Sequence, residues 1–281
     1  MHLLQAVLMG IVQGLSEFLP ISSSAHLVFT SNFYKVFNDI DISQISQQEV
    51  FLDIMLHLGT LIAVIFFFKE DLLNIFRAIC LVFKNKDFSN PNFKMGCYII
   101  LGTVLTAMLA IPLSETSGML VFMPAGVGLF LVVTGWVLLF SEWYSKRHPE
   151  KKPITLKSAI WTGLAQGLAS LPGFSRSGLT IAAGLITGSD RLSAARYSFL
   201  LSIPVILGAS MIYPLTNINF QEVLTYNWTA ILIGTAVSGI TGYLCIKYFL
   251  KFLEKFSLAF FGYYCVIAGI SAYFFFINKI G

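Results

Sequence analysis

Charged residues are scarce in this sequence. Of its 281 residues, 11% are charged and 56% are hydrophobic, whereas a typical soluble domain carries about 25% charged residues. Too few polar side chains are present to cover a surface that faces water. The scarcity excludes an ordinary soluble enzyme, gives no indication of a nucleic-acid partner, and predicts a single membrane domain over residues 1–281.

Two further features are missing. No Lys or Arg precedes Lys35, so the first apolar segment lacks the basic start of a cleavable signal peptide and is expected to belong to the mature fold. The four cysteines form no Cys-x-x-Cys pair and have no His at ligand spacing. Neither a disulfide framework nor a structural zinc site is therefore expected.

Six apolar stretches are long enough, or nearly so, to cross a bilayer, which takes about 20 residues. They lie near residues 51–68, 97–113, 119–140, 196–214, 229–250 and 257–277. Two more regions, 3–34 and 155–189, are apolar but interrupted by Pro, Gly and Ser. Each has room for two short helices joined by a turn, which predicts a re-entrant hairpin covered by protein. The predicted fold class is an all-α polytopic membrane protein with six transmembrane helices and two re-entrant helical hairpins.

Lysine and arginine gather on one side of this arrangement. Most of the 18 lie in segments 69–94, 146–157, 191–196 and 247–255, and the opposite loops carry mostly acidic residues. Because basic loops stay in the cytoplasm, both termini are predicted to lie outside. The sequence thus indicates a multi-pass membrane protein. Hairpin 3–34 would enter from the outer, periplasmic face and hairpin 155–189 from the cytoplasmic face.

The two hairpin regions resemble each other. Residues 10–24 read GIVQGLSEFLPISSS and residues 163–177 read GLAQGLASLPGFSRS, so that Gln13 aligns with Gln166. Three spans follow each copy, and an odd number of crossings turns the second copy upside down. We therefore expect an inverted-topology repeat of residues 1–141 and 155–281, with its functional site near the midplane. Chance similarity between two Gly/Ser-rich turns is the alternative.

The first hairpin carries a carboxylate at membrane depth, where a charge is costly and functional by default. This carboxylate is Glu17, although structural pairing with Arg176 is an alternative. Ser23 and His26 are three residues apart, a spacing that favours one helix face, and a His beside a Ser and a Glu suits general acid–base catalysis. His57 has no Ser or Glu close to it in the same motif and is expected to be structural. The alternative is that its segment LDIMLH lines the cavity of the functional site.

The second hairpin has the features of an anion site. Arg176 is the only Lys or Arg in LPGFSRSGLT. Gly173 frees the backbone there, and Ser175, Ser177 and Thr180 offer hydroxyls. A guanidinium, hydroxyl donors and the start of a helix together suit a phosphate. These five residues are therefore predicted to bind phosphate, although Ser/Gly-rich turns are also common without a ligand.

The segments QGLSEFLPISSSAH and LPGFSRSGLT together resemble the two signature regions of the undecaprenyl-diphosphate phosphatase family, the bacitracin-resistance proteins, and the resemblance extends over essentially the whole chain. It implies hydrolysis of undecaprenyl diphosphate to undecaprenyl phosphate and inorganic phosphate, which recycles the lipid carrier for peptidoglycan synthesis. It also implies that Glu17, Ser23, His26 and Arg176 are catalytic and that the protein lies in the bacterial inner (plasma) membrane, with its active site open to the outer, periplasmic face. A divalent cation, Mg²⁺ or Ca²⁺, is implied near Glu17 and Gln13, where Gln13 replaces the Glu of many relatives.

The expected substrate is therefore a polyprenyl diphosphate whose tail stays in the bilayer. Ser23 would attack the terminal phosphorus, with His26 or Glu17 taking its proton; direct attack by water or by His26 stays open, as does a homodimer. A transporter or flippase of the same lipid, using the same phosphate-binding turn, is the rival function, because inverted repeats with broken helices are also typical of transporters. A pure scaffold is a weaker rival, against which the buried Glu17 and Arg176 argue.

Overall fold

The computed structural model describes residues 3–37, 46–85, 88–148, 152–217 and 220–280. Within these ranges the chain is almost entirely helical, and six helices are long and apolar enough to cross a membrane, as predicted. Large apolar side chains such as Ile100, Trp136 and Phe260 are exposed on their outer surfaces. Such a surface faces lipid, so the protein is a multi-pass membrane protein, and the prediction of an all-α fold with six spans is confirmed.

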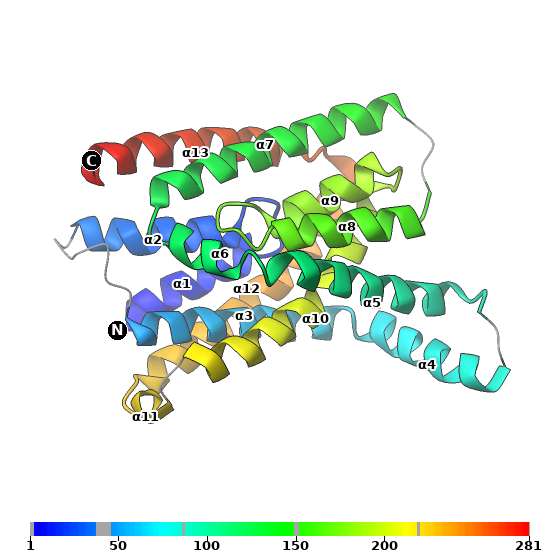
Figure 1. Cartoon of the computed structure of the whole chain (residues 1–281), viewed down its shortest axis with the longest axis horizontal. Helices are drawn as coiled ribbons and strands as arrows, with labels where there is room; N and C mark the ends of the chain where they lie inside the picture. The colour runs from blue at the N-terminus through cyan, green and yellow to red at the C-terminus, as the bar shows by residue number, and fades with distance from the viewer. Residues whose placement is uncertain (1–2, 38–45, 86–87, 149–151, 218–219, 281) are drawn as a thin grey trace.

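Figure 1 shows the helices, numbered in the order in which they follow one another along the chain. The six long helices are α3 (Gln47–Phe67), α5 (Pro91–Ala110), α7 (Pro124–Arg147), α10 (Arg191–Asn217), α12 (Trp228–Lys255) and α13 (Ala259–Ile280). Between them lie α4 (Lys69–Asn85), α6 (Ser114–Leu120) and α11 (Phe220–Val223). α7 ends at Arg147, beyond the predicted end of its span at residue 140 and of the first repeat at residue 141. The prediction was too short because hydropathy detects only the apolar part of a helix.

Both predicted hairpin regions contain two helices joined by a turn. The first pair is α1 (Leu3–Ser16) and α2 (Ser23–Phe37), and the second is α8 (Leu156–Leu168) and α9 (Arg176–Ile186). Each helix has between 11 and 15 residues, which gives a length of about 17–23 Å at about 1.5 Å per residue. None of the four can cross a hydrocarbon core of about 30 Å alone. The pairs are therefore consistent with re-entrant hairpins.

The two halves of the chain exchange helix partners. α1 of the first half packs against α12 of the second, α8 of the second packs against α5 of the first, and α7 lies beside α13 (Figure 1). Individual contacts repeat as well. Thr241 donates a hydrogen bond to the carbonyl of Gly10, and Thr106 donates one to the carbonyl of Gly163, which aligns with Gly10. The inverted repeat stays a prediction, and this exchange supports it.

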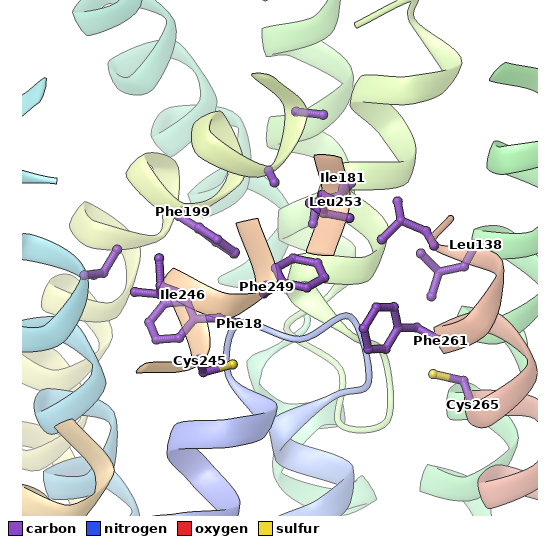
Figure 2. Close-up of a cluster of buried hydrophobic side chains, with 14 of the residues drawn as sticks. Phe18, Leu138, Ile181, Phe199, Cys245, Ile246, Phe249, Leu253, Phe261 and Cys265 are labelled. Carbon is purple, nitrogen blue, oxygen red and sulfur yellow. The ribbon is translucent and has the colours of Figure 1, made fainter. Parts of the chain in front are cut away.

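A buried core surrounds the turn that joins α1 to α2 (Figure 2). Phe18 of this turn is fully buried and meets Phe199 edge to face, with ring centroids 5.2 Å apart. The thiol of Cys245 donates to the carbonyl of Leu15, just before the turn, and that of Cys265 to the carbonyl of Pro20, within it; all four cysteines are free. The core thus holds the apolar side of the turn in place.

Ion pairs join the helix ends on the basic side of the molecule. Arg191 of α10 donates two hydrogen bonds to Glu142 of α7, at 2.7 and 2.6 Å, and Arg196 pairs with Asp71 of α4 at 2.8 Å. α4, the end of α7 and the start of α8 lie toward the right of Figure 1, whereas α1 begins and α13 ends on the left. The described basic segments therefore share one end, as the predicted orientation requires.

The turn between α8 and α9 requires glycine at position 173. Gly173 has a φ of +99°, and a Cβ there would clash with the carbonyl oxygen of Val127, whereas Gly188 has a similar φ of +97° but open space around it. Left-handed backbone costs about 1–2 kcal/mol with a side chain, and overpacking adds about 1–3 kcal/mol. We expect Gly173→Ala to lower the free energy of unfolding clearly more than the matched control Gly188→Ala.

Denaturant unfolding of the purified protein in detergent micelles measures both losses. Equal losses for the two variants would show that the clash with α7 contributes nothing and that only the backbone conformation matters.

Candidate active site

The turns of the two hairpins are hydrogen-bonded to each other. Ser177 donates to the carbonyl of Leu19 at 2.8 Å, and Ser22 donates to the carbonyl of Phe174 at 3.1 Å. Each bond joins residues more than 150 positions apart in the sequence. The polar side chains of both turns are thereby brought into one cluster.

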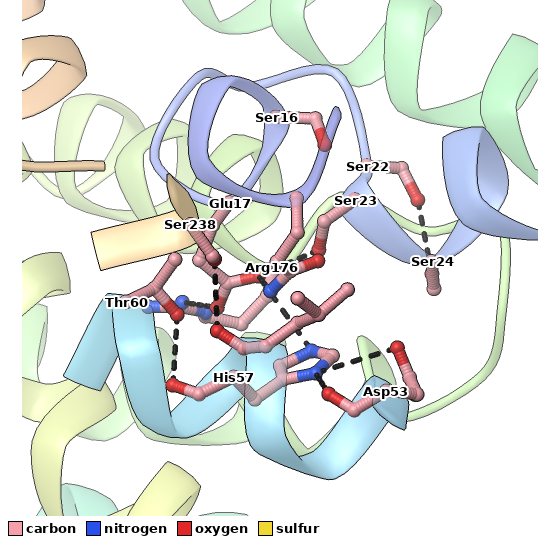
Figure 3. A network of polar contacts seen from close by, with 12 residues as sticks. Ser16, Glu17, Ser22, Ser23, Ser24, Asp53, His57, Thr60, Arg176 and Ser238 are labelled. Atoms are coloured by element: carbon pink, nitrogen blue, oxygen red, sulfur yellow. Dashed lines mark hydrogen bonds and ion pairs between the residues drawn. The ribbon is translucent and has the colours of Figure 1, made fainter. Parts of the chain in front are cut away.

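Glu17 lies at the centre of this cluster (Figure 3). Its side chain is only 5% exposed. Arg176 Nη2 donates to Oε1 at 2.5 Å, while Ser23 Oγ and Gln13 Nε2 donate to Oε2 at 2.6 and 2.9 Å. A buried carboxylate is unfavourable unless it is paired and hydrogen-bonded. Glu17 obtains its hydrogen bonds from the first hairpin and its cation from the second, so the predicted pairing of Glu17 with Arg176 is present.

Arg176 is the first residue of α9 and keeps one donor group unused. Its Nη2 binds Glu17, but its Nη1 is buried and has no hydrogen-bond partner among the described residues. Leaving a buried donor unpaired costs about 1–3 kcal/mol, and more for a charged group. α2 and α9 both begin at this cluster, and the positive ends of their helix dipoles also favour an anion. The arginine therefore presents a free cationic donor to an anionic ligand.

Ser23 begins α2, directly after a strained residue. Ser22 has a φ of +69° and is the only residue other than glycine with a positive φ in the described ranges. Such backbone costs about 1–3 kcal/mol and is concentrated at functional sites. It places Ser23 so that its hydroxyl donates to the Glu17 carboxylate. A hydroxyl bonded to a carboxylate in this way has the geometry of a nucleophile beside its base.

His26 faces away from Glu17. Its Nε2 lies 2.7 Å from the Tyr264 hydroxyl and its Nδ1 lies 2.8 Å from a backbone carbonyl, and the ring stacks on Tyr264. Within the described residues, no hydrogen bond or ion pair joins His26 to Glu17 or Ser23. Three residues correspond to about 300° around a helix, an offset of about 60° from Ser23 that lets the ring turn toward α13. Its catalytic role stays a prediction.

The hydroxyls of the second turn already have partners within the protein. Ser175 Oγ accepts from a backbone N–H of α9, Thr180 Oγ1 donates to the carbonyl of Arg176, and Ser177 binds the first hairpin through the carbonyl of Leu19. All three side chains are buried. In this structure they form, together with Gly173, the frame that holds Arg176. Direct binding of phosphate by these four residues stays a prediction.

Ligands for a metal are few around Glu17. The described ranges contain no group of three or more His, Cys, Asp or Glu that could hold a metal ion. Gln13 has an unpaired Oε1, but both oxygens of Glu17 accept hydrogen bonds, and one of them faces the guanidinium of Arg176. A metal on Glu17 would have to displace that cation. The donor set does not fit a cation held by the protein alone, so Mg²⁺ or Ca²⁺ stays a prediction from the sequence resemblance.

Two residues of α3 join the site although the sequence did not predict them there. His57 Nε2 lies 3.7 Å from Glu17 Oε2, and Asp53 Oδ1 lies 3.6 Å from His57 Nδ1 (Figure 3). The sequence favoured a structural role for His57 and gave a place of LDIMLH in the lining of the site as the alternative; the position of His57 beside Glu17 fits that alternative. A signal was available, because an Asp and a His one turn apart in an apolar span are costly unless they are used.

The chain is similar to known proteins over nearly its whole length. Residues 6–271 match the family model described as bacitracin resistance protein BacA. A protein of Methanobrevibacter smithii named undecaprenyl-diphosphatase is 39% identical to the chain, with 96% of each covered. Proteins with the same name from Halothermothrix orenii and Nitrosococcus oceani are 38% and 35% identical, covering 96% and 98% of this chain and 96% and 100% of the relative. The chain therefore belongs to the bacitracin resistance protein BacA family.

Proposed function

We propose that the protein hydrolyses undecaprenyl diphosphate to undecaprenyl phosphate and inorganic phosphate. This activity recycles the lipid carrier for peptidoglycan synthesis and confers resistance to bacitracin. The family and the name shared by its relatives support hydrolysis. They also favour hydrolysis over a transporter or flippase function, which would need an anion-binding group but no nucleophile.

The unpaired Nη1 of Arg176 is the observation that carries the proposal. A diphosphate offers several anionic oxygens, and a guanidinium can donate to them through Nη1 while Nη2 keeps its bond to Glu17. The ligand would thus satisfy a donor that the fold leaves buried and unpaired. Charge that develops on the phosphate oxygens during the reaction would be stabilised by the same group.

Ser23 is the nucleophile in this proposal. Its hydroxyl already donates to Glu17 at 2.6 Å, so Glu17 can take the proton as Ser23 Oγ bonds to the terminal phosphorus. The bond from this phosphorus to the bridging oxygen breaks, and undecaprenyl phosphate leaves with that oxygen. Water then attacks the phosphoserine, and phosphate is released.

The depth of the site supports catalysis at the membrane. His57 is the middle residue of the 21-residue helix α3, which places the site about 15 Å from the start of that helix. The side chain of Asp53 is 48% exposed and lies toward the start of α3, away from the basic end. We infer that the site opens to the outer, periplasmic face of a bacterial inner membrane, where the diphosphate could enter with its tail in the bilayer.

The assay that tests this function is phosphate release from a C55 diphosphate by the purified protein, with and without a chelator. We expect release, and we expect the chelator to lower it if Mg²⁺ or Ca²⁺ takes part through the phosphates of the substrate, as is usual for Mg²⁺. Absence of release under every metal condition would overturn the proposed function. Sedimentation of the same preparation would test the predicted homodimer.

Replacing Arg176 by Lys tests the anion-binding group. Lysine keeps a positive charge beside Glu17 but lacks the second N–H arm of the guanidinium. Loss of a charge-assisted hydrogen bond worth about 1.5–3 kcal/mol predicts a fall in kcat/KM of about 10–150-fold. Arg196→Lys is the matched control, because Arg196 pairs with Asp71 on the basic side and its replacement should leave kcat/KM unchanged. Equal activity of the two variants would contradict the assigned role.

Replacing Ser23 by Ala tests the nucleophile. The variant keeps the bonds from Arg176 and Gln13 to Glu17 but lacks the attacking oxygen, so turnover should fall by about 10³-fold or more. Substrate labelled in its terminal phosphate should label the parent protein and not the variant. Ser141→Ala is the control, because Ser141 donates to the carbonyl of Leu138 within α7 rather than to Glu17. Full activity of Ser23→Ala would exclude Ser23 as the nucleophile, and an unlabelled parent would favour direct attack by water.

A further inference from the structure

His57 and Asp53 lie beside the reacting groups, yet the proposed attack by Ser23 does not use them. They lie one turn apart on α3, and the imidazole stands between the carboxylates of Asp53 and Glu17 (Figure 3). Exposure rises along this row: the side chains of Glu17, His57 and Asp53 are 5%, 27% and 48% exposed. The row therefore leads from the buried base toward a more exposed side chain, although the Asp53 Oδ1 that faces the ring is itself buried.

The backbone of α3 fixes the tautomer of His57. Its Nδ1 lies 2.8 Å from the carbonyl oxygen of Asp53. Because a carbonyl oxygen can only accept, Nδ1 carries the hydrogen. In the neutral ring, Nε2 is then an unprotonated nitrogen directed at Glu17 Oε2. The separation of 3.7 Å is longer than a hydrogen bond, as is common for catalytic contacts before substrate binds.

The charged groups around His57 favour transfer of a proton outward. Two carboxylates flank the ring, those of Glu17 and Asp53, and either stabilises an imidazolium. The opposing charge, Arg176, is already paired with Glu17. From α12, the neighbouring helix, uncharged Ser238 donates to the carbonyl of Leu56.

We propose that His57, oriented by Asp53, is a positioning residue that removes the proton from Glu17 between the two halves of the reaction. This inference rests on the proposed function with Ser23 as nucleophile. In the first half, the proton of Ser23 Oγ moves to Glu17. The O–H bond of Glu17 then breaks as an N–H bond forms at His57 Nε2, and His57 releases this proton to water past Asp53.

Glu17 is again a carboxylate at this point and can accept a proton from the water that attacks the phosphoserine. The oxygen of that water bonds to phosphorus, the bond from phosphorus to Ser23 Oγ breaks, and Glu17 returns the proton to Ser23. Inorganic phosphate leaves, and the whole cycle releases one proton through His57. Without His57, the first half of the reaction proceeds, whereas the second waits for Glu17 to lose its proton directly to solvent.

Rapid-quench kinetics of His57→Gln tests this order of events with substrate labelled in its terminal phosphate. We expect the rate at which label first appears on Ser23 to stay within about 3-fold of the parent, while steady-state turnover falls by about 10²-fold, the contribution typical of a proton-transfer residue. Label should accumulate on Ser23. Added imidazole should restore turnover in His57→Ala, and Asp53→Asn should have a smaller effect in the same direction.

The matched control is His148→Gln, because His148 stacks on Tyr144 at the end of α7, far along the chain from the site. Its turnover should equal that of the parent. Unchanged steady-state turnover in His57→Gln would overturn the inference. So would an equal fall of the rate of Ser23 labelling and of steady-state turnover, which would indicate a structural role. A parent that releases no phosphate would overturn the proposed function, and a parent that turns over without ever carrying label would overturn both the serine step and the proton route.

Discussion

A carboxylate inside a membrane protein needs a partner, and the pair of Glu17 and Arg176 meets this requirement. The two residues come from different hairpins, 159 positions apart, so neither charge is compensated until both turns have met. Removing one partner of a buried ion pair typically costs about 3–5 kcal/mol. The two hairpins must therefore come together both to complete the fold and to assemble the site. The rest of the structure holds these two turns against each other.

The polar residues of the two turns divide into two groups by their contacts. Ser22, Ser175 and Ser177 bind backbone groups, which is the requirement for irregular chain at membrane depth. Ser23 and Arg176 direct polar atoms at Glu17 instead. Phe18 adds an apolar anchor on the other side of the first turn. The hydrogen bonds of the turn backbone thus do not depend on Ser23, Arg176 or Glu17. These three residues can bind a ligand while the turns keep their conformation.

Features that depend on composition could be predicted from the sequence, whereas features that depend on side-chain direction could not. The six spans could be predicted because a helix that crosses lipid needs a minimum apolar length. The partner of Glu17 could be predicted because few cationic side chains lie in the hairpin regions. The orientation of His26 toward Tyr264 was not readable, because helical spacing defines a face only to within tens of degrees. The contact of His57 with Glu17 depends on how α3 packs beside the first hairpin, and no local pattern reports this packing. The seryl and threonyl hydroxyls of the second turn look alike in sequence, although their partners differ.

The exchange of partners between the two halves also bears on how the protein is made. Gly10 of α1 and Thr241 of α12 are hydrogen-bonded but lie 231 positions apart. At a synthesis rate of about 5–20 residues per second, α1 waits roughly 10–50 s for the surface it packs against. For the first 159 residues made after Glu17, the first hairpin exists without Arg176 to pair with that carboxylate. A nascent chain in this condition is exposed to degradation and needs lipid or an insertion factor as a temporary neighbour. The stability of the first half of the chain therefore depends on synthesis of the second half.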